Sequence, residues 1–132
     1  MILGIGTDLI ETERIATSIT RYGNRFLHRV FTAGEIAYCQ QRKNAVESFA
    51  ARFAAKEAGA KALGTGISRG VQWREIEVVR KPGHRPMLVW HGRAAERAAT
   101  MGIEHTHLSL THSRTTSMAV VVLEGRPVIP QR

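Results

Sequence analysis

The chain has 132 residues, 43% hydrophobic and 23% charged, a balance typical of one folded domain rather than a disordered segment. No apolar run approaches the ~20 residues that cross a bilayer, and the start has no basic leader, so we expect neither export nor a membrane partner. Cys39 is the only cysteine, which excludes an internal disulfide and favours the cytosol. The net charge of +8 predicts an acidic partner, such as nucleic acid, a phosphorylated ligand or an acidic protein.

The first segment, residues 2–10, is an apolar run that predicts a strand. It contains Asp8, the only aspartate among eleven acidic residues. A carboxylate in such a run must be paired, hydrogen-bonded or metal-bound, because burying it bare costs several kcal/mol. Asp8 is therefore a candidate metal ligand, with a structural polar role as the alternative.

Helical spacing of apolar residues predicts a helix over 12–22, which Gly23 can end. Residues 24–31 are expected to form a connection. Thr32 and Glu35 then have the spacing of a capping box, which predicts the start of a short helix.

The longest predicted helix runs from about residue 45 to 63, is rich in alanine and is followed by Gly64. Glu57 and Lys61 lie one turn apart on its flank, where they could simply form an i,i+4 ion pair. Lys56 falls in the apolar stripe itself. Either its stem snorkels outward or its ammonium group has a buried partner.

A glycine-rich loop, 64–70, follows this helix. Strands are predicted at 75–81 and 87–90 around a turn at 82–84, then a helix at 93–101, and strands at 107–112 and 117–123. The pattern predicts an α+β fold, a single small domain (1–124) with a mainly antiparallel sheet packed against one long helix and shorter helices. Residues 125–132 are expected to be a C-terminal tail.

Asp8 and Glu57 could converge on one cation if the long helix packs on the sheet. Two carboxylates with water and phosphate oxygens suit Mg²⁺, and Lys61 is the obvious phosphate ligand beside them. Loops like 64–66 can present backbone N–H groups to an anion, although Gly64 could be only a helix cap. The six histidines lack zinc-binding spacing; on a strand, His105 and His107 share one face while His112 faces the other way.

Several segments together resemble the holo-acyl-carrier-protein synthases, the short bacterial phosphopantetheinyl transferases. The resemblance is carried, in chain order, by Gly4-Ile5-Gly6-Thr7-Asp8-Leu9-Ile10-Glu11, by Arg52-Phe53-Ala54-Ala55-Lys56-Glu57-Ala58, by Lys61-Ala62-Leu63-Gly64-Thr65-Gly66, and by Leu108-Ser109-Leu110-Thr111-His112-Ser113. It covers nearly the whole chain. Thr111 departs from the serine expected there, but either residue offers a hydroxyl.

The resemblance implies a Mg²⁺-dependent enzyme that transfers phosphopantetheine from coenzyme A to a serine of acyl carrier protein in fatty acid biosynthesis. It implies catalytic roles for Asp8, Glu57 and Lys61, with Asp8 and Glu57 holding the metal against the coenzyme A pyrophosphate. It also implies that members are homotrimers with shared active sites, and it leaves the serine's base open between a metal-bound water and Glu35. Residues that would bind the nucleotide end are Lys43, Arg52, Gly64, Thr65, Gly66 and His112, and those that would bind the carrier are Arg14, Arg21 and Arg25.

A small basic nucleic-acid-binding domain is the alternative from another class. It would explain the charge, but the few aromatic residues are not interleaved with basic ones as on a stacking platform. It would also leave the lone Asp8 unexplained. We therefore favour an enzyme that has no nucleic-acid partner.

Overall fold

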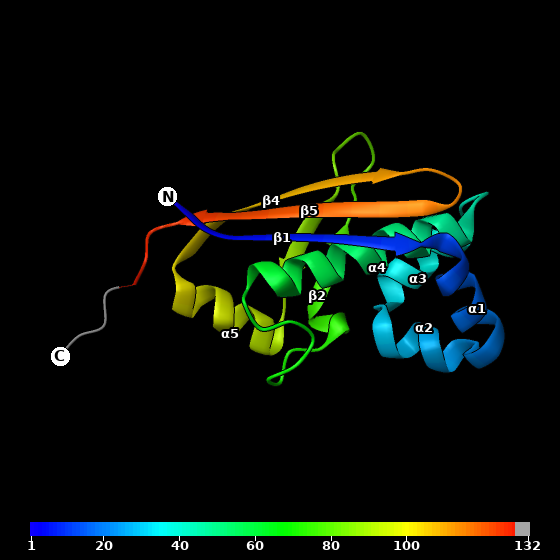
Figure 1. The fold of residues 1–132 in the computed structure, drawn as a ribbon, viewed down its shortest axis with the longest axis horizontal. Coiled ribbons are helices and arrows are strands. Elements are labelled where there is room, and N and C mark those ends of the chain that lie inside the picture. Colours follow the sequence, from blue (N-terminus) through cyan, green and yellow to red (C-terminus); the bar gives the residue numbers. More distant parts are fainter. Residues whose placement is uncertain (129–132) are drawn as a thin grey trace.

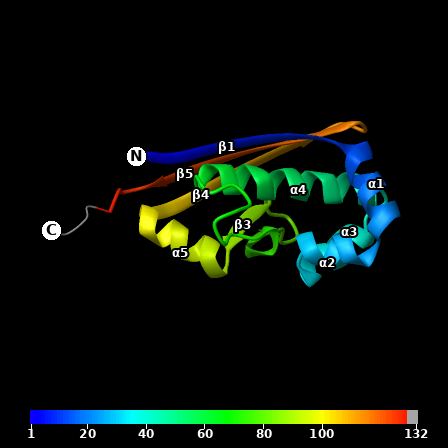
Figure 2. The same ribbon diagram turned by 60° about the horizontal axis from the view of Figure 1, so that its bottom comes forward.

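The computed structural model describes residues 1–128. Figure 1 shows a long three-stranded sheet, made by β1 (Ile2–Glu11), β4 (Ile103–His112) and β5 (Thr116–Gly125), with the long helix α4 (Ala45–Ala62) lying along it. Figure 2 shows α4 sandwiched between this sheet and the rest of the chain. That other part consists of α2 (Asn24–Val30), α3 (Ala33–Gln40), a 3₁₀ turn (Trp73–Glu75), β2 (Ile76–Val79), β3 (Met87–Trp90) and α5 (Gly92–Met101). The helix α1 (Thr12–Tyr22) runs from the end of β1 past the end of α4 toward α2 (Figure 2). The α+β prediction is confirmed.

The long sheet is antiparallel with the order β1-β5-β4. On its inner face, the side chains of Ala119, Val121 and Leu123 of β5 are buried in the core against α4. The pairs Ile5↔Val122 and Leu9↔Met118 lie on the outer face, where Ile5 and Leu9 are 59% and 66% exposed. No helix of the described residues covers that outer face (Figure 2). One face of the sheet is thus buried by α4, and the other is apolar and open.

Glycine allows β1 to lie directly against α4. A Cβ atom at Gly4 or Gly6 would overlap a backbone carbonyl oxygen of the helix, that of Ala62 or Ala58 respectively. Asp8 follows on the same, helix-facing side of β1 because side chains alternate along a strand. The two glycines therefore set the distance at which Asp8 meets α4.

The predicted connection at 24–31 is wrong, because residues 24–30 form the helix α2. Gly23, with a positive φ of 55°, separates it from α1. Leu27 and Val30, three residues apart, are both buried in the core. Seven residues are too few for a periodic pattern to stand out, and tertiary packing stabilises such a short helix.

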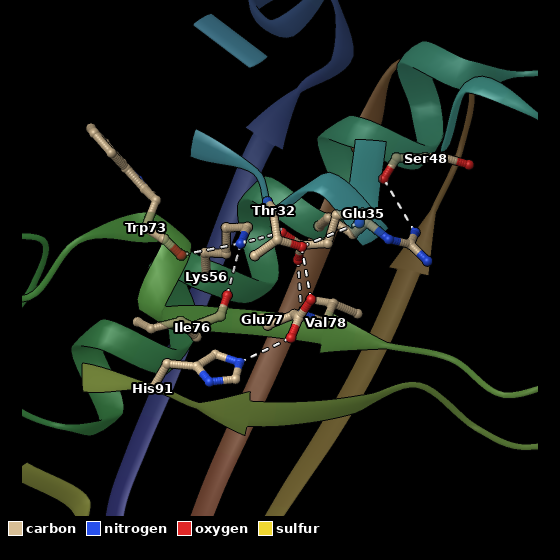
Figure 3. A network of polar contacts seen from close by, with 10 residues as sticks. Thr32, Glu35, Ser48, Lys56, Trp73, Ile76, Glu77, Val78 and His91 are labelled. Atoms are coloured by element: carbon tan, nitrogen blue, oxygen red, sulfur yellow. Dashed lines mark hydrogen bonds and ion pairs between the residues drawn. The ribbon is translucent and has the colours of Figure 1, made fainter. Parts of the chain in front are cut away.

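The capping box at the start of α3 is confirmed. The backbone N–H of Glu35 donates to Thr32 Oγ1 at 3.2 Å, and that of Thr32 donates to Glu35 Oε1 at 2.8 Å. The same Glu35 carboxylate accepts a hydrogen bond from Val78 N and lies 2.7 Å from Lys56 Nζ, with both side chains fully buried (Figure 3). Lys56 therefore has a buried partner rather than a snorkelling stem. Burial also removes Glu35 as a candidate base for a substrate serine.

The ion pair belongs to a wider polar network (Figure 3). Burial lowers the pKa of Lys56, and the carboxylate of Glu35 opposes that effect. Burial alone would raise the pKa of the neighbouring Glu77. Hydrogen bonds from His91 (2.9 Å) and Thr32 (2.7 Å) outweigh it, so the pKa of Glu77 is lowered. The network joins α3, α4 and the hairpin β2–β3.

The remaining predicted elements agree with the structure apart from their ends. The strand predicted from 107 begins at Ile103, and the one predicted to end at 123 continues to Gly125. Gly125 was placed in the tail, whose residues 129–132 lie outside the described part of the chain. Among residues 1–128, no helix is long and apolar enough to span a bilayer.

Candidate active site

Asp8 and Lys61 meet where β1 crosses the last turns of α4. Lys61 Nζ lies 3.1 Å from Asp8 Oδ1 and donates to the carbonyl oxygen of Thr7 at 3.0 Å. The Asp8 side chain is 16% exposed, whereas that of Lys61 is 52% exposed. Lys61 can therefore hold Asp8 and still face a ligand. The alternative pairing of Lys61 with Glu57 is not the one that forms.

Glu57 lies one turn before Lys61 on the same flank of α4 and is half-buried. Its Oε1 accepts a hydrogen bond from the indole N–H of Trp73 at 2.9 Å. Trp73 belongs to the 3₁₀ turn before β2. Glu57 and Lys61 thus share one flank of α4, with Glu57 bound to Trp73 and Lys61 bound to Asp8.

The carboxylates of Asp8 and Glu57 suit Mg²⁺, which takes water and phosphate ligands besides protein oxygens, better than a metal that needs three or four protein ligands. Among residues 1–128, no cluster of three or more His, Cys, Asp or Glu side chains could hold a metal ion. Mg²⁺ is commonly bound by one or two carboxylates, with water and substrate phosphates completing the octahedron. Asp8 and Glu57 supply hard oxygen donors, and the exposed Lys61 supplies a cation for a phosphate.

The histidines are distributed as their spacing predicted. His105 and His107 lie on the outer face of β4 with ring centroids 6.5 Å apart, and His107 Nε2 is 2.5 Å from Glu124 Oε1. His112 faces the opposite way and lines a pocket.

That pocket has a volume of about 740 Å³ and lies between the N-terminal part of α4, the end of α3, the β2–β3 hairpin and β4. It contains Lys43, Arg52 and His112, three residues predicted to bind the nucleotide end. Further cations line it, and Glu47 is the only acidic residue in its lining. The additional basic residues are Arg42, Arg80 and Arg85.

Arg52 is the unusual member of this pocket because it is only 5% exposed and has no carboxylate partner among the described residues. Its guanidinium lies 4.1 Å from the centroid of the Tyr38 ring, and that of Arg42 lies 5.4 Å from the same centroid. Arg52 Nη1 donates to Ser48 O at 3.5 Å, while the buried Nε has no partner within residues 1–128. Two neighbouring cations without a counter-ion attract an anion.

The glycine loop lies beyond the opposite end of α4. Arg52 and Gly64 are twelve residues apart, roughly 18 Å along a helix. The amide groups of Gly64, Thr65 and Gly66 donate to the carbonyl oxygens of Lys61 and Ala60, and so end the helix. In this conformation those three amide groups cap α4 and are not available to bind an anion. Within a single subunit, the glycine loop and Arg52 therefore do not line the same pocket.

The residues predicted to bind the carrier are all exposed. Arg14 and Arg21 are exposed on α1, and Arg25 is exposed on α2. The guanidinium of Arg21 lies 5.9 Å from the centroid of the Tyr22 ring. The structure leaves these side chains accessible to an acidic protein.

Sequence reasoning missed Trp73 and most of the pocket wall. The adjacent pair Arg42-Lys43 is a visible signal in the sequence for a basic wall. The basic residues Arg80 and Arg85 also line the pocket, but they flank the predicted turn at 82–84, whose residues indicate only a turn. No local pattern links Trp73 with Glu57, sixteen residues away.

An exposed lysine that binds one carboxylate and shares a helix flank with a second, together with a separate basic pocket, supplies the kinds of group that phosphoryl-type transferases use. The model of the 4′-phosphopantetheinyl transferase superfamily matches residues 4–121. The chain belongs to this superfamily and, on the similarities that follow, to its holo-acyl-carrier-protein synthase family.

Among curated proteins, the chain is 55% identical over 124 residues to the holo-[acyl-carrier-protein] synthase of Koribacter versatilis, covering 94% of this chain and 99% of that protein. Among solved structures, the holo-[acyl-carrier-protein] synthase of Neisseria meningitidis superposes with a TM-score of 0.86 at 35% identity, over 94% of this chain and 99% of the other. The Bacillus anthracis synthase, solved in complex with CoA (3′,5′-ADP), gives 0.78 at 36% identity, over 96% and 99%. The predicted family is confirmed, and the chain is an enzyme of that family.

Proposed function

We propose that this enzyme transfers the 4′-phosphopantetheine group of coenzyme A to a serine of apo acyl carrier protein, with Mg²⁺, and supports fatty acid biosynthesis in the cytoplasm. The serine hydroxyl oxygen attacks the β-phosphorus of coenzyme A and forms a new P–O bond. The P–O bond of the pyrophosphate breaks, and adenosine 3′,5′-bisphosphate leaves with the electron pair. The hydroxyl proton passes to solvent.

The observation that carries this proposal is the uncompensated charge around Arg52. A leaving group with a phosphate at each end of a ribose is strongly anionic, and a pocket of about 740 Å³ is of the size that binds such ligands. Arg52 and Lys43 would hold phosphate there, and His112 would lie beside the adenosine. A buried guanidinium gains more from an anion than an exposed one does, because water screens it less.

The reacting phosphates would lie against Asp8, Glu57 and Lys61. Phosphoryl transfer depends mainly on in-line positioning and on neutralisation of charge. Asp8 and Glu57 would hold Mg²⁺, which supplies Lewis-acid neutralisation of the pyrophosphate. Lys61 would add a second positive charge through its exposed ammonium group, while its contact with Asp8 keeps the carboxylate in place.

The exposed arginines of α1 and α2, Arg14, Arg21 and Arg25, support an acidic protein as the second substrate. All three side chains are exposed on adjoining helices, α1 and α2. Charges of this kind attract a partner over roughly 8–10 Å at moderate ionic strength.

The mass of apo carrier protein, measured after incubation with coenzyme A and Mg²⁺, tests the activity. We expect a gain of one phosphopantetheine group, and no gain when coenzyme A is omitted or when the carrier serine is replaced by alanine. A thermal-shift series with coenzyme A against oligonucleotides tests the ligand, because a ligand that binds only the folded state raises the melting temperature. Stabilisation by oligonucleotides alone would contradict the proposal.

We also propose a homotrimer with active sites shared between subunits. Two features support it. The outer face of the long sheet exposes Ile5 (59%), Leu9 (66%) and Met118 (38%), and contiguous apolar surface of this kind marks an interface. The Arg52 pocket and the Asp8–Lys61 site are separated along α4 within one chain, so a neighbouring chain could bring its pocket to this site.

Sedimentation equilibrium tests the assembly, and a monomer mass at micromolar concentration would reject it. Mixing an inactive Glu57→Ala protein with an inactive His112→Ala protein tests the shared site. If each site takes Glu57 from one subunit and His112 from the next, mixed trimers regain part of the activity. No recovery, despite proven subunit exchange, would place both residues in one chain's site.

A further inference from the structure

Trp73 ties the side chain of Glu57 to the buried network below it. The indole N–H donates to Glu57 Oε1 at 2.9 Å, and the backbone carbonyl of the same residue accepts a hydrogen bond from Lys56 Nζ at 3.1 Å. Lys56 is in turn bound to Glu35 and to the carbonyl oxygen of Ile76. One residue thus links a half-buried carboxylate to a fully buried ion pair.

The indole itself is also held in place. Figure 3 shows the carbonyl of Trp73 turned toward Lys56 while the ring points away from the network. The ring packs beside Phe53, with centroids 6.2 Å apart, and the guanidinium of Arg29 lies 5.8 Å from its centroid. Contacts on the ring and a bond on the backbone together restrict where the N–H can point.

We propose that Trp73 is a positioning residue that orients the Glu57 carboxylate for the metal; this inference rests on the proposed function. An indole N–H is a donor only, so it can bind the carboxylate but cannot compete for the cation. Its bond to Oε1 restricts rotation of the carboxylate, whose other oxygen, Oε2, would remain available to the ion. Hydrogen bonds from surrounding residues commonly orient metal-binding side chains in this way, and their loss typically lowers metal affinity roughly 10- to 100-fold.

The chain contains a matched control, because both of its tryptophans donate an indole hydrogen bond. Trp90 Nε1 donates to Thr106 Oγ1 at 3.0 Å, and Trp90, like Trp73, is half-buried. Trp90→Phe removes the same kind of bond from a residue whose indole N–H binds Thr106 rather than Glu57. Trp73→Phe keeps an aromatic ring beside Phe53 but removes the N–H donor together with part of the indole, and Trp90→Phe makes the same loss of ring volume.

The experiment measures Mn²⁺ binding by electron paramagnetic resonance in the presence of saturating coenzyme A. We expect the Kd for Mn²⁺ to rise roughly 10-fold in Trp73→Phe, at the lower end of the usual range because the site is partly open. Trp90→Phe should match the wild type. Turnover of Trp73→Phe should recover at high Mg²⁺, so that the metal requirement changes more than kcat. Equal Mn²⁺ affinity in all three proteins would overturn the inference.

Fluorescence of Trp90→Phe gives a second measurement that does not depend on how well Trp73→Phe folds. In Trp90→Phe, the only tryptophan is Trp73, and Mn²⁺, being paramagnetic, should quench it strongly. In Trp73→Phe, the emission of Trp90 should change little. If Mn²⁺ binds to Trp90→Phe without quenching, Trp73 does not lie beside the metal. If the wild type binds no Mn²⁺ with coenzyme A, the metal assignment itself fails, and this inference fails with it.

Discussion

Replacing Lys56 with methionine should strongly destabilise the fold. Methionine keeps the length and apolar stem of lysine but leaves the Glu35 carboxylate buried without its cation, which lies 2.7 Å away in the native protein. It also leaves the carbonyl oxygens of Trp73 and Ile76 without the donor Nζ. Removing one partner of a buried pair typically costs about 3–5 kcal/mol. For a chain of this length, that loss lowers the melting temperature by roughly 10–18 °C.

Lys61→Met is the matched control, since it makes the same change in the same helix. Lys61 also lies close to a carboxylate, 3.1 Å from Asp8, but its side chain is 52% exposed. Exposed pairs contribute only about 0–1 kcal/mol because water screens them. Chemical denaturation at one fixed protein concentration measures both losses. A second change, Glu35→Gln in the Lys56→Met protein, should restore part of the stability, because a neutral amide needs no counter-ion.

The reasoning would be refuted if Lys56→Met and Lys61→Met lost similar free energies of unfolding. It would also be refuted if Glu35→Gln destabilised the Lys56→Met protein further. Either result would mean that the buried carboxylate does not depend on the charge of Lys56.

Three further predictions concern the site, the carrier surface and the polar network. Asp8→Ala or Glu57→Ala should abolish transfer and keep the circular dichroism spectrum; full activity at ordinary Mg²⁺ would contradict the metal assignment, and loss of folding in Asp8→Ala would favour a structural role. Arg14→Glu with Arg21→Glu should weaken carrier binding, measured by calorimetry, and leave coenzyme A binding unchanged, whereas equal loss for both ligands would exclude this surface as the docking site. Glu77→Gln should cost stability above pH 4.5, and the difference from wild type should shrink as pH falls through the lowered pKa of Glu77, because protonation then removes the same interaction; a difference that does not change with pH would contradict this reasoning.

The sequence predicted the parts of this fold that depend on local pattern. The strand around Asp8, the long helix with Glu57 and Lys61, and the capping box at Thr32 all follow from spacing within a few residues. Contacts between distant segments could not be predicted in this way. The pattern indicates that Lys56 needs either exposure or a partner, but it does not identify Glu35, which lies twenty-one residues earlier on another helix.

The candidate site shows the same division. The pairing of Lys61 with Asp8 rather than Glu57 depends on how β1 crosses α4, which no local pattern encodes. The resemblance supplied Lys43, Arg52 and His112, and the structure brings them into one pocket because β4 lies near the N-terminal part of α4. The Trp73–Glu57 bond depends on the course of the chain after the glycine loop, which periodicity does not describe.

The close approach of β1 to α4 has a consequence for engineering this enzyme. Exchanging glycine for alanine usually stabilises a protein, because alanine reduces the entropy of the unfolded chain. At Gly4 and Gly6 the added methyl group would collide with backbone carbonyl oxygens, which cannot rotate away as a side chain can. The strand would have to move off the helix and take Asp8 away from Lys61. A thermostabilising library should therefore leave these two positions unchanged, since a variant selected there for rigidity would lose the contact between Asp8 and Lys61.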